Sequence, residues 1–126
     1  MKNVLLVDDN KVFVDLLSYS LKKKHLNILC AYSVDEAIEK ISKFKFDLIC
    51  SDFEMGTKNG LELLEYLRRL RNDVQFIMLT GNDSNDLINK VERMNGIFMD
   101  KTTPNLVNEI IKEIKEKVIN EWFRMD

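Results

Sequence analysis

Proline, glycine and cysteine are scarce in this chain of 126 residues, which has one proline, four glycines and two cysteines. With so little proline and glycine, no linker divides the sequence, and no repeat or low-complexity segment is visible. The length is that of one compact domain, and a hydrophobic fraction of 45% is enough to form its core. We therefore expect residues 1–126 to form a single domain.

The few cysteines and the single histidine argue against a disulfide framework and a zinc site. Cys30 and Cys50 each lie in an apolar, strand-like run. This placement predicts two free, buried thiols and a reducing cytosol. The one histidine, His25, is expected at the surface.

Long apolar runs and an excess of charge of one sign are also missing. No window approaches the roughly 18 apolar residues of a membrane span. The apolar run after Lys2 is too short for a signal peptide, whose core needs roughly 7–15 residues. Nineteen basic and 21 acidic side chains give a formal charge of −2, which does not favour binding to nucleic acid or anionic lipid. We expect a cytoplasmic protein that binds neither nucleic acid nor a membrane directly.

Five apolar runs alternate with five amphipathic segments. The runs predict strands at residues 3–7, 28–32, 47–51, 75–79 and 97–99. The segments between them predict helices. Their apolar faces are expected to be Val12, Phe13, Leu16, Leu17 and Leu21; Val34, Ala37, Ile38 and Ile41; Leu61, Leu64, Leu67 and Leu70; Leu87, Ile88, Val91 and Met94; and Val107, Ile110, Ile111, Ile114 and Val118. Ser33 and Glu36 match a capping box, and Pro104 suits the first turn of the last helix. The alternation predicts an α/β fold with an open parallel sheet and helices on both faces.

Polar side chains follow four of the predicted strands. Asp8 and Asp9 follow the first strand, Asp52 the third, Thr80 the fourth and Lys101 the fifth. Ligand sites in open parallel sheets lie at the carboxyl ends of the strands, so we expect these groups to converge. Three carboxylates require a cation, and oxygen ligands favour Mg²⁺. Thr80 and Lys101 would then hold phosphoryl oxygens, and one aspartate would be free to act as a nucleophile.

Each of these residues also has a purely structural interpretation. Asp9 or Asn10 is a reasonable cap for the first helix, Thr80 a turn residue and Lys101 a surface lysine. Their joint placement at one edge favours the site.

Four segments together resemble a known family. They are LLVDDN at 5–10, DLICSDFEMGTKNG at 47–60, IMLTGN at 77–82 and FMDK at 98–101. Over essentially its whole length the chain resembles the receiver domain of bacterial two-component response regulators. The resemblance implies a flavodoxin-like sheet of strand order 2-1-3-4-5, in which a strand separates Cys30 from Cys50.

The resemblance also implies a role for each polar residue. Asp52 would accept a phosphoryl group from a histidine kinase or a histidine phosphotransfer protein. The implied Mg²⁺ ligands are Asp9 and Asp52 directly, Asp8 through water, and the backbone carbonyl of Glu54. Thr80 and Lys101 would grip the phosphoryl group, and Phe98 would be the aromatic that turns inward on activation.

The sequence departs from the family pattern at four positions. Gly56 and Thr102 stand where the family usually has proline, and Met94 stands where it usually has glycine. Asp100 occupies a strand position that is usually apolar.

We interpret the chain as a phosphorylation-dependent switch that catalyses only its own phosphorylation and dephosphorylation. Its output would be a downstream protein, a separate output domain or a homodimer formed through the last helix and strand. Two alternatives are a Mg²⁺-dependent phosphohydrolase and a receiver-like domain that works without phosphorylation. Such a phosphohydrolase would need an aspartate as general acid two residues after Asp52, whereas this chain has Glu54 there. Trp122 and Phe123 would form a docking patch, begin a linker helix, or pack on the last turn.

Overall fold

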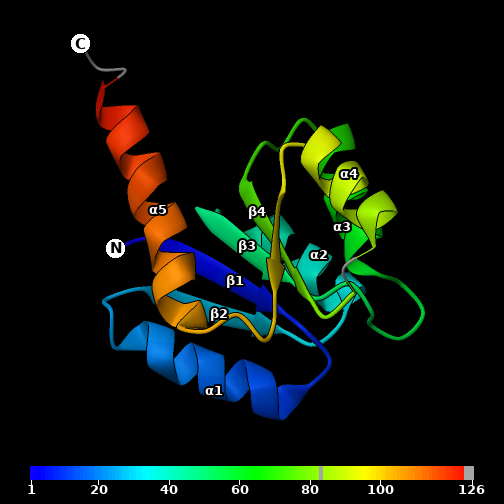
Figure 1. The fold of residues 1–126 in the computed structure, drawn as a ribbon, viewed down its shortest axis with the longest axis horizontal. Coiled ribbons are helices and arrows are strands. Elements are labelled where there is room, and N and C mark those ends of the chain that lie inside the picture. The colour runs from blue at the N-terminus through cyan, green and yellow to red at the C-terminus, as the bar shows by residue number, and fades with distance from the viewer. Residues whose placement is uncertain (83, 124–126) are drawn as a thin grey trace.

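The computed structural model describes residues 1–82 and 84–123, with the backbone alone for residues 115–123. Within these residues five strands alternate with five helices, as predicted (Figure 1). The strands are β1 Asn3–Val7, β2 Asn27–Ala31, β3 Leu48–Ser51, β4 Gln75–Thr80 and β5 Ile97–Asp100. The helices are α1 Lys11–Lys22, α2 Val34–Lys43, α3 Gly60–Arg69, α4 Asn85–Arg93 and α5 Leu106–Phe123. Pro104 lies in the turn before α5 rather than in its first turn, which corrects the prediction. The side chains of Trp122 and Phe123 lie outside the described part of the chain.

The five strands form one parallel sheet in the order β2-β1-β3-β4-β5, which confirms the expected topology. Leu6 of β1 is paired with Cys30 on one side and Cys50 on the other, so β1 separates the two cysteines. Both thiols are free. Cys50 is buried as predicted, whereas Cys30 is only half-buried because β2 is an edge strand.

Helices cover both faces of the sheet. In Figure 1, α1 and α5 lie on one face, and α2, α3 and α4 lie on the other. Successive residues of β1 pack alternately on the two faces of the sheet. Val4 and Leu6 pack with α1 and α5, and Leu5 and Val7 pack with α2, α3 and α4. Central strands buried on both sides read as unbroken apolar runs, which is why the sequence showed them without alternation.

Two helices differ from prediction in the face that they bury. Helix α1 buries Val14, Leu17, Ser18 and Leu21, whereas Val12 and Leu16 are 71% and 65% exposed. Helix α3 buries Leu63, Leu64 and Leu67, and Leu70 comes after its end and is 60% exposed. Each segment carries apolar residues around more than half of its circumference. Periodicity alone therefore cannot select the buried face, and packing on the sheet decides it.

No helix in the described ranges has both the length and the apolar character needed to cross a membrane.

Candidate functional site

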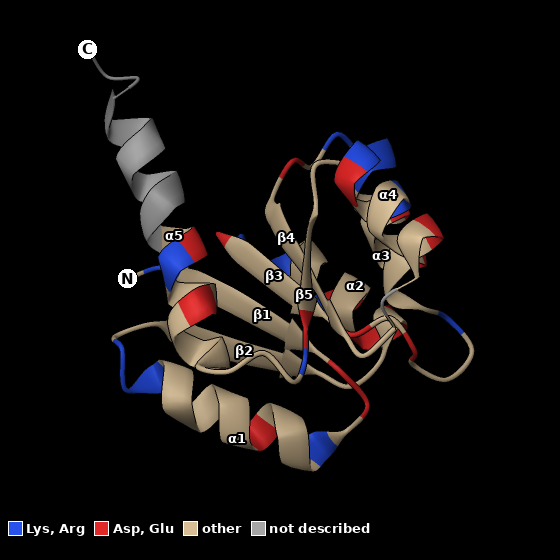
Figure 2. Cartoon of the chain, in the orientation of Figure 1, with Lys and Arg blue, Asp and Glu red and all other residues tan. Residues whose placement is uncertain are grey.

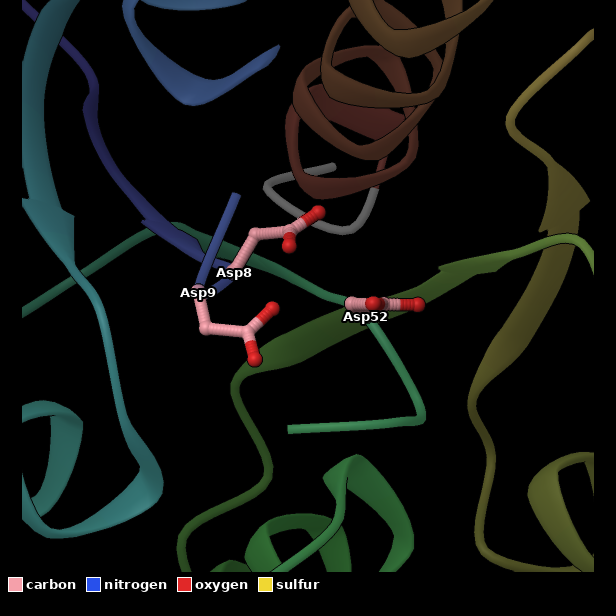
Figure 3. A group of neighbouring side chains, drawn as sticks. All are labelled: Asp8, Asp9 and Asp52. Atoms are coloured by element: carbon pink, nitrogen blue, oxygen red, sulfur yellow. The ribbon is translucent and has the colours of Figure 1, made fainter. Parts of the chain in front are cut away.

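Three aspartates lie together where β1 and β3 end (Figure 3). Asp8 and Asp9 follow β1, and the backbone N–H of Asp52 donates to the carbonyl of Val7, 2.9 Å away. One carboxylate oxygen from each aspartate lies within 4.8 Å of the other two. Asp8 and Asp52 are buried, whereas Asp9 is exposed. The expected convergence of these three side chains is therefore found.

Hydrogen bonds at the start of α1 show which of the neighbouring polar residues caps the helix. The side chain of Asn10 caps the helix by accepting the N–H of Phe13 at 3.1 Å. The Asp8 carboxylate accepts the N–H of Asn10 at 3.0 Å. Because Asn10 is the cap, Asp9 is not needed for that structural task.

One ammonium group reaches into the acid cluster. Lys101 follows β5 directly, and its Nζ lies 2.7 Å from Asp8 Oδ2 and 3.3 Å from Asp52 Oδ2. The same Nζ stands 4.7 Å from the centre of the Phe13 ring, within cation–π range. In Figure 2, the red segment after β1 and the red and blue end of β5 lie on the same edge of the sheet. In the sequence, Phe13 is recognisable only as part of an apolar helix face, and no motif marks it as a neighbour of the lysine.

The charges in the cluster shift two pKa values. Burial, and then the neighbouring Asp8, raise the pKa of Asp52; Lys101 and the N–H of Phe53, 2.8 Å from Asp52 Oδ1, oppose this rise. Burial disfavours the ammonium of Lys101, but its bonds to Asp8 and Asp52 outweigh burial and raise its pKa. Three carboxylates and one ammonium leave a site that favours additional positive charge.

The donor set fits a hard divalent cation. Three carboxylates can each offer an oxygen to one ion, and no sulfur or nitrogen ligand is among them. Mg²⁺ prefers such oxygen ligands and keeps several of its waters.

Thr80 and Glu54, the other two predicted residues, lie at different depths. Thr80 is the last residue of β4 and is buried, and its Oγ1 accepts the N–H of Asn82 at 3.2 Å. Its carbonyl accepts the backbone N–H of Lys101 at 3.4 Å, which connects the two residues. Glu54 is exposed in the loop after β3, and its carboxylate is not part of the acid cluster.

The exposed aspartate borders two hollows in the surface. One, of about 590 Å³, is lined by Asp9 together with the loop of residues 53–59. The other, of about 220 Å³, lies between Asp9, the start of α2 and the same loop. A larger hollow of about 810 Å³ includes Lys2 and Asp47, at the amino-terminal edge of the sheet, and has no connection to the acid cluster. Two hollows next to the cluster therefore open beside Asp9.

Gly60 explains the spacing between Asp52 and the start of α3. A Cβ atom on this residue would lie 2.1 Å from the backbone oxygen of Asp52. The N–H of Gly60 donates to the carbonyl of Phe53 at 2.8 Å. Only glycine permits this close approach, which brings α3 against the residue that ends β3.

The family model described as "Response regulator receiver domain" matches residues 4–115. The chain belongs to this family. The receiver domain is the regulatory signalling domain of two-component systems. Such domains bind Mg²⁺ at an acidic pocket and interact with histidine kinases or phosphotransfer proteins and with output domains.

Solved structures of receiver domains share this fold. A CheY-like receiver domain protein from Methanospirillum hungatei is 25% identical, with a TM-score of 0.88 and coverage of 98% of each chain. The response regulator TrrA from Thermotoga maritima, solved in complex with Mg²⁺-BeF, is 25% identical, with a TM-score of 0.78; the match covers 90% of this chain and 99% of that one. A response regulator from Burkholderia pseudomallei, solved with a phosphorylated aspartic acid and a calcium ion, is 26% identical, with a TM-score of 0.80; the match covers 98% of this chain and 75% of that one.

Proposed function

We propose that residues 1–126 form one receiver domain that works as a phosphorylation-dependent switch, with Asp52 as the phosphoryl acceptor. The donor is the phosphohistidine of a histidine kinase or of a phosphotransfer protein. The observation that carries the proposal is the acid cluster of Asp8, Asp9 and Asp52, with the Lys101 ammonium paired to two of its members.

Asp52 is the best nucleophile of the three. Both Asp8 and Asp52 accept a backbone N–H and pair with Lys101, but Lys101 Nζ lies closer to Asp8, at 2.7 Å, than to Asp52, at 3.3 Å, and Asp9 is exposed to water. Burial and Asp8 raise the pKa of Asp52, and a less solvated, more basic carboxylate is more nucleophilic. In the transfer, an Asp52 oxygen bonds to phosphorus while the bond from phosphorus to the histidine nitrogen breaks. The electron pair of that bond stays on the nitrogen.

The remaining residues bind and orient the transferred group. We assign Asp9 and Asp52 as direct Mg²⁺ ligands, Asp8 as a ligand through water and the carbonyl of Glu54 as a further ligand. Bound Mg²⁺ supplies positive charge where phosphoryl oxygens carry negative charge. Lys101 offsets more of that charge, and the hydroxyl of Thr80 hydrogen-bonds a phosphoryl oxygen.

The signal leaves through β4 and β5. Thr80 follows the phosphoryl group, and Phe98, half-buried on β5 next to Met78 of β4, turns further inward as Thr80 moves. The surface of α4, β5 and α5 then changes shape and engages a downstream protein, an output domain or a second copy.

An exposed apolar stripe on α1 supports a protein as the donor. Val12, Leu16 and Tyr19 are 71%, 65% and 63% exposed and lie on a helix that starts two residues after Asp9. Leu16→Glu should slow transfer from whichever purified, autophosphorylated histidine kinase phosphorylates the wild type. It should leave transfer from a small acyl phosphate unchanged. Leu70→Glu, at an equally exposed leucine on the other face of the sheet, is the control.

The test of the acceptor is the intact mass after incubation with a small acyl phosphate and Mg²⁺. Wild type and the control Asp86→Asn, on the exposed surface of α4, should gain one phosphoryl group. Asp52→Asn should gain none, because its amide is not a nucleophile. An adduct of normal yield on Asp52→Asn would refute the assignment, as would a wild-type adduct that survives mild base. No wild-type adduct at all would favour a domain that works without phosphorylation.

A further inference from the structure

Lys101 lies in the turn that follows β5, and no proline comes directly after it. Lys101 is followed by Thr102 and Thr103, and the first proline is Pro104. The side chain of Lys101 is long and flexible, and fixing such a chain costs about 2 kcal/mol of rotamer entropy. A backbone held in place limits the positions that the ammonium can reach and so reduces the freedom that must be lost.

Asp100 supplies both acceptors that close this turn. Its Oδ1 accepts the N–H of Thr102 at 2.8 Å and the hydroxyl of Thr102 at 2.7 Å. Its backbone carbonyl accepts the N–H of Thr103 at 3.1 Å. The bonds from Thr102 lower the pKa of Asp100, so the acceptor is a charged carboxylate at neutral pH.

Lys101 lies inside this turn, between Asp100 and Thr102. Its own backbone N–H has only a long bond of 3.4 Å to the carbonyl of Thr80. Its Nζ nevertheless meets Asp8 at 2.7 Å and Asp52 at 3.3 Å. The bonds of Asp100 thus tie together the residues on either side of the lysine, and each is shorter than the bond of the lysine's own N–H.

We propose that Asp100 is a positioning residue, whose side-chain bonds to Thr102 hold the backbone so that the Lys101 ammonium reaches Asp8 and Asp52. This inference rests on the proposed function, because it assigns a role in phosphoryl transfer to Lys101. Asp100 is not part of the acid cluster and acts only through the lysine. An apolar residue at this strand position could not make these bonds, which accounts for a carboxylate here.

The experiment measures phosphorylation by a small acyl phosphate at saturating Mg²⁺, over a range of donor concentrations. Asp100→Ala should lower the maximal rate about 10- to 100-fold, since a misplacement of about 1 Å can cost a reacting geometry about 100-fold. The donor concentration for half-maximal rate should not change. Asp100→Asn keeps an oxygen that accepts both bonds, so it should keep the wild-type rate within about twofold.

A double-mutant cycle tests whether Asp100 acts through the lysine. Asp100→Ala should have no further effect on the rate in a Lys101→Ala background. Thr102→Val, which removes the hydroxyl and keeps the N–H, should give a smaller loss than Asp100→Ala. It is also the second variant if Asp100→Ala does not fold. Asn72→Ala is the matched control, because Asn72 Oδ1 accepts the N–H of Val74 in the same kind of turn before β4, far from the acids.

Three outcomes would overturn the inference while wild type is phosphorylated normally. They are an unchanged rate in both Asp100→Ala and Thr102→Val, an equal loss with and without Lys101, and an Asp100→Asn variant as slow as Asp100→Ala. If wild type itself takes up no phosphate, the proposed function has failed instead.

Discussion

Replacing Gly60 by alanine should damage the site and the fold together. The added Cβ would lie 2.1 Å from the backbone oxygen of Asp52 and 2.9 Å from Met78 Sδ. Real Cβ atoms essentially never come closer than 3.0 Å, so the Asp52 carbonyl and the start of α3 must move apart by at least 3.0 − 2.1 = 0.9 Å. A flexible side chain could yield easily, but this neighbour is the backbone of the proposed acceptor.

The expected cost follows from overpacking. An extra methyl group in a packed region typically costs about 1–3 kcal/mol, and the backbone contact places Gly60→Ala near 3 kcal/mol. Gly96→Ala is a matched control, because its Cβ would lie 2.8 Å from Val91 Cγ1 and so also overpacks, but far from the aspartates. Gly56→Ala meets no atom within 4 Å and pays only for a φ of +60°, about 1 kcal/mol.

The assays are urea unfolding for stability and intact mass for phosphate uptake from a small acyl phosphate. Gly60→Ala should lose both stability and most of its uptake rate, because Asp52 is displaced. Gly96→Ala should lose stability but keep its uptake under conditions where it is folded. A Gly60→Ala variant that is as stable as Gly56→Ala, or that takes up phosphate at the wild-type rate, would refute the reasoning.

Three further predictions concern charge and thiol chemistry. The pKa of Asp52 in the folded state is raised above its ordinary value of 3.8. Between these two pKa values the folded protein therefore binds more protons than the unfolded chain. Without metal, the free energy of unfolding should fall as pH rises from about 3.8 through the folded-state pKa. In urea unfolding measured at several pH values, Asp52→Asn should not show this decrease and should be more stable than wild type at neutral pH. Parallel plots of unfolding free energy against pH for the two proteins would contradict the prediction. Mg²⁺ at 100 times its Kd should add about 2.7 kcal/mol to the wild-type unfolding free energy and much less to Asp9→Asn, and an unchanged thermal midpoint would count against a metal site. Burial raises the pKa of Cys50 to about 12, so a thiol reagent should modify half-buried Cys30 in the native state and Cys50 only after unfolding; equal rates would disprove this.

The order of elements and the acid cluster were predictable because each is recorded locally in the sequence. Buried parallel strands leave apolar runs, and the polar residue after each run marks a carboxyl end. Asp8, Asp9 and Asp52 are 44 residues apart at most, yet parallel pairing of β1 with β3 brings them together. The sequence pattern at the end of each single strand was therefore enough to predict that these three aspartates lie together.

The turn before β5 could not be predicted in the same way. The family position that usually carries glycine is Met94. In the structure Asn95 takes the left-handed conformation with φ of 58°, and Gly96 packs closely on Val91. Arg68 Nε donates to the carbonyl of Met94 at 2.7 Å and fastens the turn to α3. Asparagine tolerates this conformation well, but only the contacts from another helix decide which residue adopts it.

Asp8 and Asp9, the two adjacent aspartates after β1, repel each other and lie in different environments. Asp8 is buried, and its charge is offset inside the protein by Lys101 and the N–H of Asn10. Asp9 is exposed at the edge of the two hollows beside the cluster. Lys101 is shared between Asp8 and Asp52, so it cannot neutralise both fully. The fold alone thus leaves negative charge at its carboxyl edge, and an incoming cation relieves that repulsion. The repulsion that makes the cluster costly would therefore also be the source of the affinity for Mg²⁺ that we propose, and Lys101 would set how much repulsion is left for the metal to relieve.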